Sequence, residues 1–188
     1  MSLLYADMIH LKLLMGEKES ASEYYEMAKS IDSSYELKLR YIWLLIDILK
    51  DWKQACSQCD VLLGTLPDDP IVEDAEELNY LLPRTYIFKA FCHALLQEKE
   101  LTGNCLSTIK GYPLVRGDNH SYLANLCKLL LEKDWFLNEV KVLLIQMKIE
   151  IEALPKDATY REEFLDYLSE MISGTLPDIE ARCPFAPY

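Results

Sequence analysis

The sequence predicts an all-α protein, a solenoid of about four helical hairpins followed by a C-terminal helix. Apolar residues recur every three or four positions, four similar charged joins separate the apolar runs, and two early segments repeat with an offset of 34 residues. The 188 residues are 51% hydrophobic and contain only 6 glycines and 8 prolines, a composition that suits a helical core. We therefore expect a single domain over residues 1–174 and an irregular tail over 175–188.

The clearest internal repeat lies in the first third of the chain. Residues 16–28 and 50–62 share one pattern, in which a small residue is followed four positions later by a bulkier one and then, after three more, by an apolar one. These positions hold Ala21, Tyr25, Ala28, Ala55, Cys59 and Leu62. This spacing suits the second helix of a hairpin where it packs against the first.

This period and this order of residue types resemble the tetratricopeptide (TPR) repeat, in which stacked helix pairs form a solenoid. The resemblance covers residues 2–67 as two repeats. It implies an inner face built from alternate helices, on which a protein partner is held. Ile9 and Trp43 fall where that family usually has a small residue, so we expect the helix pairs to lie further apart than usual.

The first half of the chain divides into two hairpins and an acidic insertion. The first helix ends at Gly16, and Asp32 to Ser34 provide a turn and a cap for the third helix. From Tyr41 to Leu49 nearly every residue is apolar, which indicates a helix covered on several sides. A fourth helix is expected from Trp52 to about Leu63. Residues 68–79 then read as an acidic insertion, either a dock for a basic segment or a solubilising loop.

Two looser hairpins are expected over residues 80–154, followed by a closing helix over 158–174. Pro83 suits the first turn of the fifth helix, and Asp118, Asn119 or Ser121 can cap the seventh. The eighth helix, from Phe136 to Leu154, has a stripe of Val140, Leu143, Leu144, Met147, Ile151 and Leu154. Residues 145–152 also alternate as in a strand, but the length and composition of the segment favour a helix.

Composition argues against several classes of partner. A net charge of -12 disfavours nucleic acid and anionic membranes, because both are bound mainly through Lys and Arg. The sequence has neither a secretory leader pattern nor an apolar run long enough to span a bilayer. Six scattered cysteines read as reduced thiols, so an intracellular location, cytoplasmic or nuclear, is expected.

No motif for catalysis, cofactor binding or metal binding emerges, so we expect neither an enzyme nor a cofactor. Cys56 and Cys59 form the only CxxC pair, and without a second pair they indicate core packing rather than zinc. His10, His93 and His120 are not at metal-ligand spacing. An α-helical enzyme remains an alternative only if a histidine and a carboxylate share a deep pocket.

The TPR resemblance implies a partner-binding face that includes His10, Arg40, Leu44 and Asp47. Some members of the family clamp an acidic peptide tail with several cations, whereas here only Arg40 is suited to a carboxylate. An apolar or basic peptide or helix is therefore the expected guest. The alternative is a structural segment of a larger helical scaffold in a multiprotein complex, with self-association through the apolar ends of the solenoid.

Overall fold

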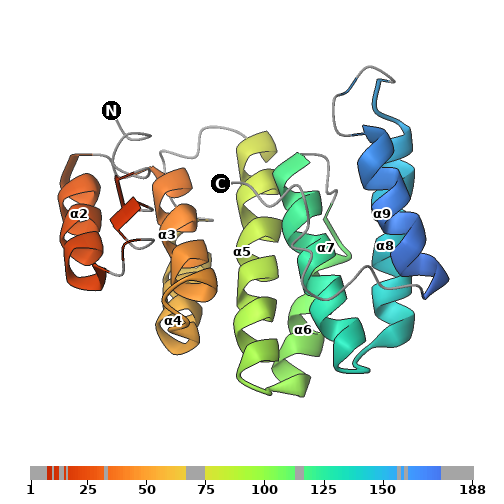
Figure 1. Cartoon of the computed structure of the whole chain (residues 1–188), viewed down its shortest axis with the longest axis horizontal. Helices are drawn as coiled ribbons and strands as arrows, with labels where there is room; N and C mark the ends of the chain where they lie inside the picture. The colour runs from red at the N-terminus through yellow and green to blue at the C-terminus, as the bar shows by residue number, and fades with distance from the viewer. Residues whose placement is uncertain are drawn as a thin grey trace.

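The computed structural model describes residues 8–9, 11–12, 15, 17–31, 34–66, 75–112, 117–155, 158 and 161–174. These residues form helices and turns and contain no strand, which confirms the all-α prediction (Figure 1). The described helices are α2 (Lys18–Ile31), α3 (Tyr35–Asp47), α4 (Trp52–Thr65), α5 (Ala75–Leu95), α6 (Lys99–Ile109), α7 (Gly117–Glu132), α8 (Leu137–Glu152) and α9 (Arg161–Ser173). Most of the first expected helix and the tail over 175–188 lie outside the described residues.

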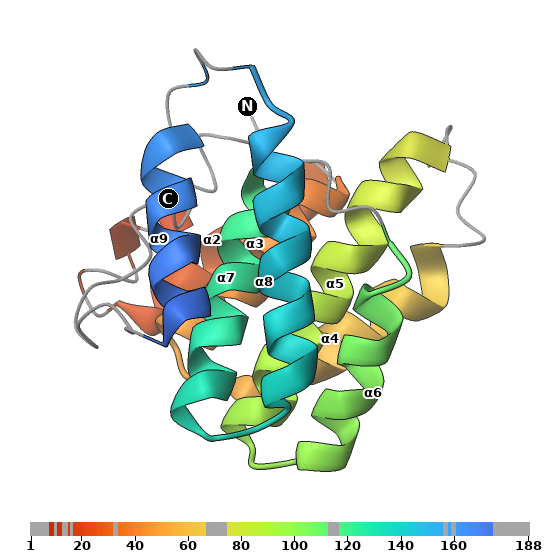
Figure 2. The same ribbon diagram turned by 90° about the vertical axis from the view of Figure 1, so that its right-hand side faces the viewer.

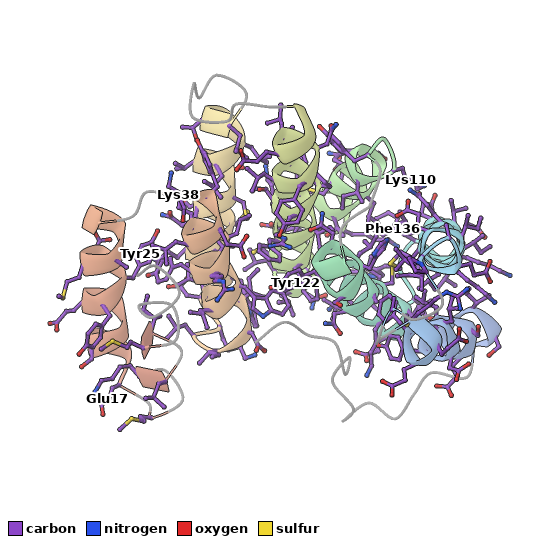
Figure 3. The ribbon with its side chains drawn as sticks, turned by 90° about the horizontal axis from the view of Figure 1, so that it is seen from above. Glu17, Tyr25, Lys38, Lys110, Tyr122 and Phe136 are labelled. Atoms are coloured by element: carbon purple, nitrogen blue, oxygen red, sulfur yellow. The ribbon has the colours of Figure 1, made fainter. Side chains whose placement is uncertain are left out.

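Along the long axis of the molecule the helices run in chain order from α2 to α8 and α9, with α3 and α4 at one position and α8 and α9 at another (Figure 1). Helix α5 contacts α3, α4, α6 and α7, while α3 also contacts α4, α7 contacts α8, and α8 contacts α9. Viewed from above, α3, α5 and α7 form a row with α4 and α6 along one side of it (Figure 3). We call this row the α3–α5–α7 layer.

Three of the joins between helices contain a residue with a left-handed backbone conformation. Lys50, Gln97 and Asp134 have positive φ values of 55°, 66° and 53°, which place the chain in the left-handed region just after a helix. After Gln97 and Asp134, the next amide donates to a carbonyl five residues earlier, from Glu98 to His93 (2.8 Å) and from Trp135 to Leu130 (2.9 Å). The similar charged joins in the sequence therefore correspond to similar chain reversals.

Helix α3 begins and packs as its sequence predicts. The Ser34 hydroxyl accepts a hydrogen bond from the Leu37 amide at 3.4 Å and so caps the helix. The buried residues on α3 are Tyr35, Leu37, Leu39, Tyr41, Ile42, Leu44, Leu45 and Ile46. They point in several directions, so neighbours cover this helix on more than one side. On one of these sides, Tyr41 stacks on Tyr25 of α2, with ring centroids 3.6 Å apart.

Helix α5 begins earlier than the sequence suggests. It begins at Ala75, so Pro83 lies inside the helix rather than in its first turn, and 75–79 are helical rather than part of an insertion. An internal proline removes one backbone hydrogen bond. Here the buried side chains of Leu81 and Pro83 itself compensate by packing in the core. The rest of the acidic insertion, 68–74, lies outside the described residues.

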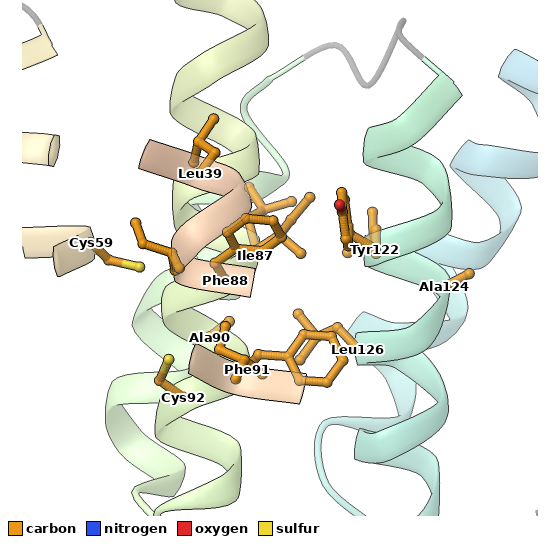
Figure 4. Close-up of a cluster of buried hydrophobic side chains, with 14 of the residues drawn as sticks. Leu39, Cys59, Ile87, Phe88, Ala90, Phe91, Cys92, Tyr122, Ala124 and Leu126 are labelled. Carbon is orange, nitrogen blue, oxygen red and sulfur yellow. The ribbon is translucent and has the colours of Figure 1, made fainter. Parts of the chain in front are cut away.

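The centre of the core is the middle of α5. Its side chains point toward α3 and α4 on one side and toward α7 on the other, as Phe88, Phe91 and Cys92 show (Figure 4). Helix α8 is continuous across 145–152, which excludes the strand alternative there. The buried positions of α8 are those of the predicted stripe: Val140, Leu143, Leu144, Met147 and Ile151.

Candidate partner-binding surface

One stripe of α3 lies along the α3–α5–α7 layer. Glu36, Arg40, Trp43 and Asp47 are spaced by four, three and four residues, which places them on one face of the helix. Arg40 Nε lies 3.4 Å from Glu36 Oε1, and Asp47 Oδ1 lies 3.6 Å from Lys50 Nζ. The Arg40 and Asp47 side chains are about one third exposed, so both ion pairs are open to solvent and to a partner.

A buried arginine joins the three helices of this layer. Arg84 on α5 is only 2% exposed, and its Nε donates to Asn119 Oδ1 on α7 at 2.9 Å. Its Nη1 donates to Glu36 Oε2 on α3 at 3.2 Å, and its guanidinium lies 4.2 Å from the Tyr80 ring centroid. Asn119 in turn donates through Nδ2 to the Tyr80 carbonyl at 3.3 Å. A buried guanidinium is tolerated because its planar donors are satisfied from several directions.

Aromatic rings fill the layer one to two turns further along α3. The Trp43 ring lies 5.4 Å from Phe88, 5.5 Å from Phe91 and 4.6 Å from Tyr122, measured between centroids. Phe88 and Phe91 belong to α5 and Tyr122 to α7, so a side chain of α3 reaches across to α7. The centre of the layer is therefore packed, and a partner would contact the half-exposed charges beside the rings.

The predicted site residues have different positions. Arg40 and Asp47 share the half-exposed stripe of α3. Leu44 is only 8% exposed and belongs to the core, so its side chain packs the helix rather than lining an open surface. His10 lies outside the described residues. The structure thus brings Arg40 and Asp47 together on one surface and places Leu44 in the core.

The sequence analysis did not single out Glu36, Arg84 or Tyr122, although they connect the layer. It named Asn119, with Asp118 and Ser121, as a possible cap of the seventh helix, but α7 begins at Gly117 and all three residues lie inside it. One signal was present: Arg84 and Asn119 are 35 residues apart, close to the period of the early repeat. Two polar residues about one repeat apart fall at equivalent positions of successive repeats, and this spacing would predict a contact between α5 and α7. The 48-residue separation of Glu36 and Arg84 hides the same relationship, because the acidic segment lies between them.

A second polar cluster joins α4 to α5 and to the start of α6. Cys56 Sγ lies 3.7 Å from His93 Nε2, and His93 Nδ1 lies 2.6 Å from Glu98 Oε2. This order of thiol, imidazole and carboxylate is also that of a nucleophile with its base. Burial, however, raises the pKa of the Cys56 thiol to about 11. The thiol is therefore protonated at neutral pH, and the cluster acts as a polar contact between helices.

The five described cysteines are free thiols, four of them buried. Burial, together with contact with Cys92, also raises the pKa of Cys59 well above its usual value. No group of three or more His, Cys, Asp or Glu side chains among the described residues has the arrangement of a metal site. Cys59 itself is fully buried, as the core-packing interpretation of the CxxC pair requires.

Comparison of the chain with protein-family models, with curated proteins and with solved structures finds no significant match. Within the described residues, no helix combines the length and the apolar character needed to cross a bilayer.

Proposed function

We propose that the helices form an α-solenoid of TPR-like hairpins, and that the protein is a non-enzymatic scaffold or adaptor. In this proposal α3 with α4, α5 with α6 and α7 with α8 are the successive hairpins. A partner segment binds along the α3–α5–α7 layer, beside the half-exposed Arg40 and Asp47.

The contacts between helices support the solenoid. Each described first helix of a hairpin contacts its own second helix, and α3, α5 and α7 contact one another in sequence. Helix α4 also packs against α5 of the next hairpin. In stacked-hairpin proteins each unit covers the apolar face of its neighbour, because a single pair of helices cannot shelter that face alone.

The single observation that carries the function is the continuity of the layer across three hairpins. The Glu36–Arg84–Asn119 hydrogen bonds and the contact between Trp43 and Tyr122 fix α3, α5 and α7 relative to one another. A rigid surface made from several helices loses little entropy when it binds an extended or helical segment. Such a surface suits recognition of a protein rather than chemistry on a small substrate.

Charge indicates which partner to test first. The chain carries a net charge of -12, and the Asp47 carboxylate lies on the half-exposed stripe. A basic amphipathic helix can place a cation near Asp47 and an apolar side chain beside the half-exposed Trp43. On the stripe of Glu36, Arg40, Trp43 and Asp47, an acidic peptide meets Arg40 as the one cation, and that guanidinium already faces Glu36.

The test uses fluorescent amphipathic peptides of equal apolar content and opposite net charge. Fluorescence anisotropy is expected to show binding of the basic peptide and weaker binding of the acidic one. Asp47→Lys should weaken the basic peptide about tenfold, since it replaces an attractive charge by a repulsive one. Val61→Lys, at an exposed position on α4, introduces a cation away from the layer and serves as the control. Equal binding to wild type and Asp47→Lys would exclude this surface.

A second candidate function is a structural segment of a larger helical scaffold. Exposed apolar side chains near both ends of the row of helices favour it: Leu11, Met15 and Met27 at one end, and Val142, Ile145 and Ile149 at the other. A scaffold segment would cover these residues with another subunit or another hairpin.

A further inference from the structure

Helix α8 has two apolar faces, and only one of them is buried. Val142, Ile145 and Ile149 are 54%, 42% and 61% exposed, and their spacing of three and four residues aligns them as one stripe. Helix α8 lies near one end of the row of helices, and Figure 2 shows α8 and α9 in front when that end faces the viewer. The stripe is opposite in register to the buried one, so it has no packing role within the described hairpins.

The equivalent helices of the other hairpins lack such a stripe. The exposed large apolar residues are Val61 on α4 and Leu101 on α6, one on each helix. On α8 they are Leu137, Val142, Ile145 and Ile149. All three helices are the second member of a proposed hairpin, and α8 is the one that lies near the end of the row. A solvent-facing helix with this pattern usually has a partner.

The charges beside the stripe identify a second copy of the chain as that partner. The exposed positions of α8 include only two charged residues, Lys141 in its first half and Glu152 at its end. When two α8 helices pair antiparallel about a two-fold axis near Ile145, Val142 of one copy faces Ile149 of the other. Lys141 of each copy then lies near Glu152 of its counterpart, so both charge pairs are attractive. A parallel pair would instead place like charges together.

We propose that the protein self-associates through this face, as a two-fold homodimer in which the α8 helices pair antiparallel. The contact is one helix pair, smaller than the roughly 1,200–2,000 Å² of a stable interface, so dimerisation is weak and concentration-dependent. It uses the end of the row of helices rather than the α3–α5–α7 layer, and it therefore stands or fails independently of peptide binding.

Sedimentation velocity of the full chain, from about 1 to about 200 µM, tests the proposal. Wild type is expected to shift from monomer to dimer over this range. Ile145→Glu should weaken the dimer at least about tenfold, because it buries a charge at the centre of the stripe. Val61→Glu on α4 is the matched control and should leave the dimer unchanged. Circular dichroism melting of each variant checks that these surface changes leave the fold intact.

Exchange of the two charges tests the orientation of the pair. Lys141→Glu alone and Glu152→Lys alone should each weaken the dimer about fivefold, whereas the double variant should recover wild-type affinity. A chain that stays monomeric throughout the range, or a dimer indifferent to Ile145→Glu, would overturn the proposal. A dimer that the double exchange fails to restore would overturn the antiparallel arrangement.

Discussion

Arg84 Nε donates a hydrogen bond of 2.9 Å to Asn119 Oδ1, and the two side chains are both buried between α5 and α7. The same guanidinium reaches Glu36 on α3, so one cation connects three helices that are distant in sequence. A buried charge stabilises a fold only when its donors are met, because unmet donors retain the full cost of leaving water. The packing of the layer therefore depends on polar contacts as well as on its apolar core.

Asn119→Ala removes one acceptor from this buried cation. The free energy of unfolding is expected to fall by about 1–3 kcal/mol, the cost of leaving a buried polar group without its partner. Urea unfolding followed by circular dichroism gives the value. Asn104→Ala, at an exposed position on α6, should change stability by less than about 0.5 kcal/mol. Equal effects of the two changes would show that the Arg84 contact contributes nothing.

Leu44→Ala tests the core role of a residue that sequence reasoning placed on the binding face. The side chain is buried, so its truncation leaves a cavity and should lower the free energy of unfolding by about 2–5 kcal/mol. Val61→Ala removes an exposed apolar side chain and is the comparison. Leu44→Glu would consequently report on folding rather than on partner binding. A Leu44→Ala variant as stable as wild type would place Leu44 at the surface after all.

Gln97→Gly is expected to stabilise the protein by about 0.5–1 kcal/mol. The residue has a φ of 66°, a region that glycine enters without the steric cost that other residues meet. Gln97→Val is the opposing control at the same position, since a branched side chain fits this backbone worst. Thermal melting should place the glycine variant above wild type and the valine variant below it. The reverse order would mean that the join does not have this conformation.

Stability is expected to decline between about pH 9 and pH 11. Burial raises the pKa of Cys105, like that of Cys56, from 9.0 to about 11, so the folded chain retains protons that the unfolded chain releases. Below pH 9 both states keep these protons, and stability is independent of them. As pH rises through this window the unfolded state gains the advantage, and the free energy of unfolding falls. Denaturant titrations at several pH values measure the slope.

Cys105→Ala provides the control for this slope. The variant removes one of the thiols and should show a shallower decline between the same pH values, whatever its stability at pH 7. Cys56 should also react with iodoacetamide ever faster from pH 8 to pH 10 without reaching a plateau, because the thiolate is the reactive form. A rate that levels off as the pH approaches 10 would indicate that the Cys56 thiol has an ordinary pKa in the folded protein.

Local sequence signals predicted the helices well. Spacing of apolar residues located α3, α4, α8 and α9 to within a few residues, and Ser34 was among the residues predicted to cap α3. These features depend on neighbours along the chain. The start of α5 was misplaced because Pro83 is usually a first-turn residue, whereas here packing on several sides outweighs the loss of one backbone hydrogen bond.

Contacts between distant helices were the part that the sequence did not reveal. Arg84 looks like an ordinary surface cation until α3 and α7 are placed on either side of it. Likewise the sequence predicted that Leu44 and Arg40 both face the inner surface. The packing of α3 buries Leu44 and leaves Arg40 half exposed. Helical periodicity gives the face of a helix, but the depth of each residue depends on its neighbours.

Helix α5 contacts four other helices, α3, α4, α6 and α7. These are the other helix of its own proposed hairpin and members of the hairpins on either side, so every one of these contacts joins immediate neighbours. Here the middle is a single 21-residue element shared by the units before and after it. We therefore expect the melting of α5 to separate the described helices before it from those after it.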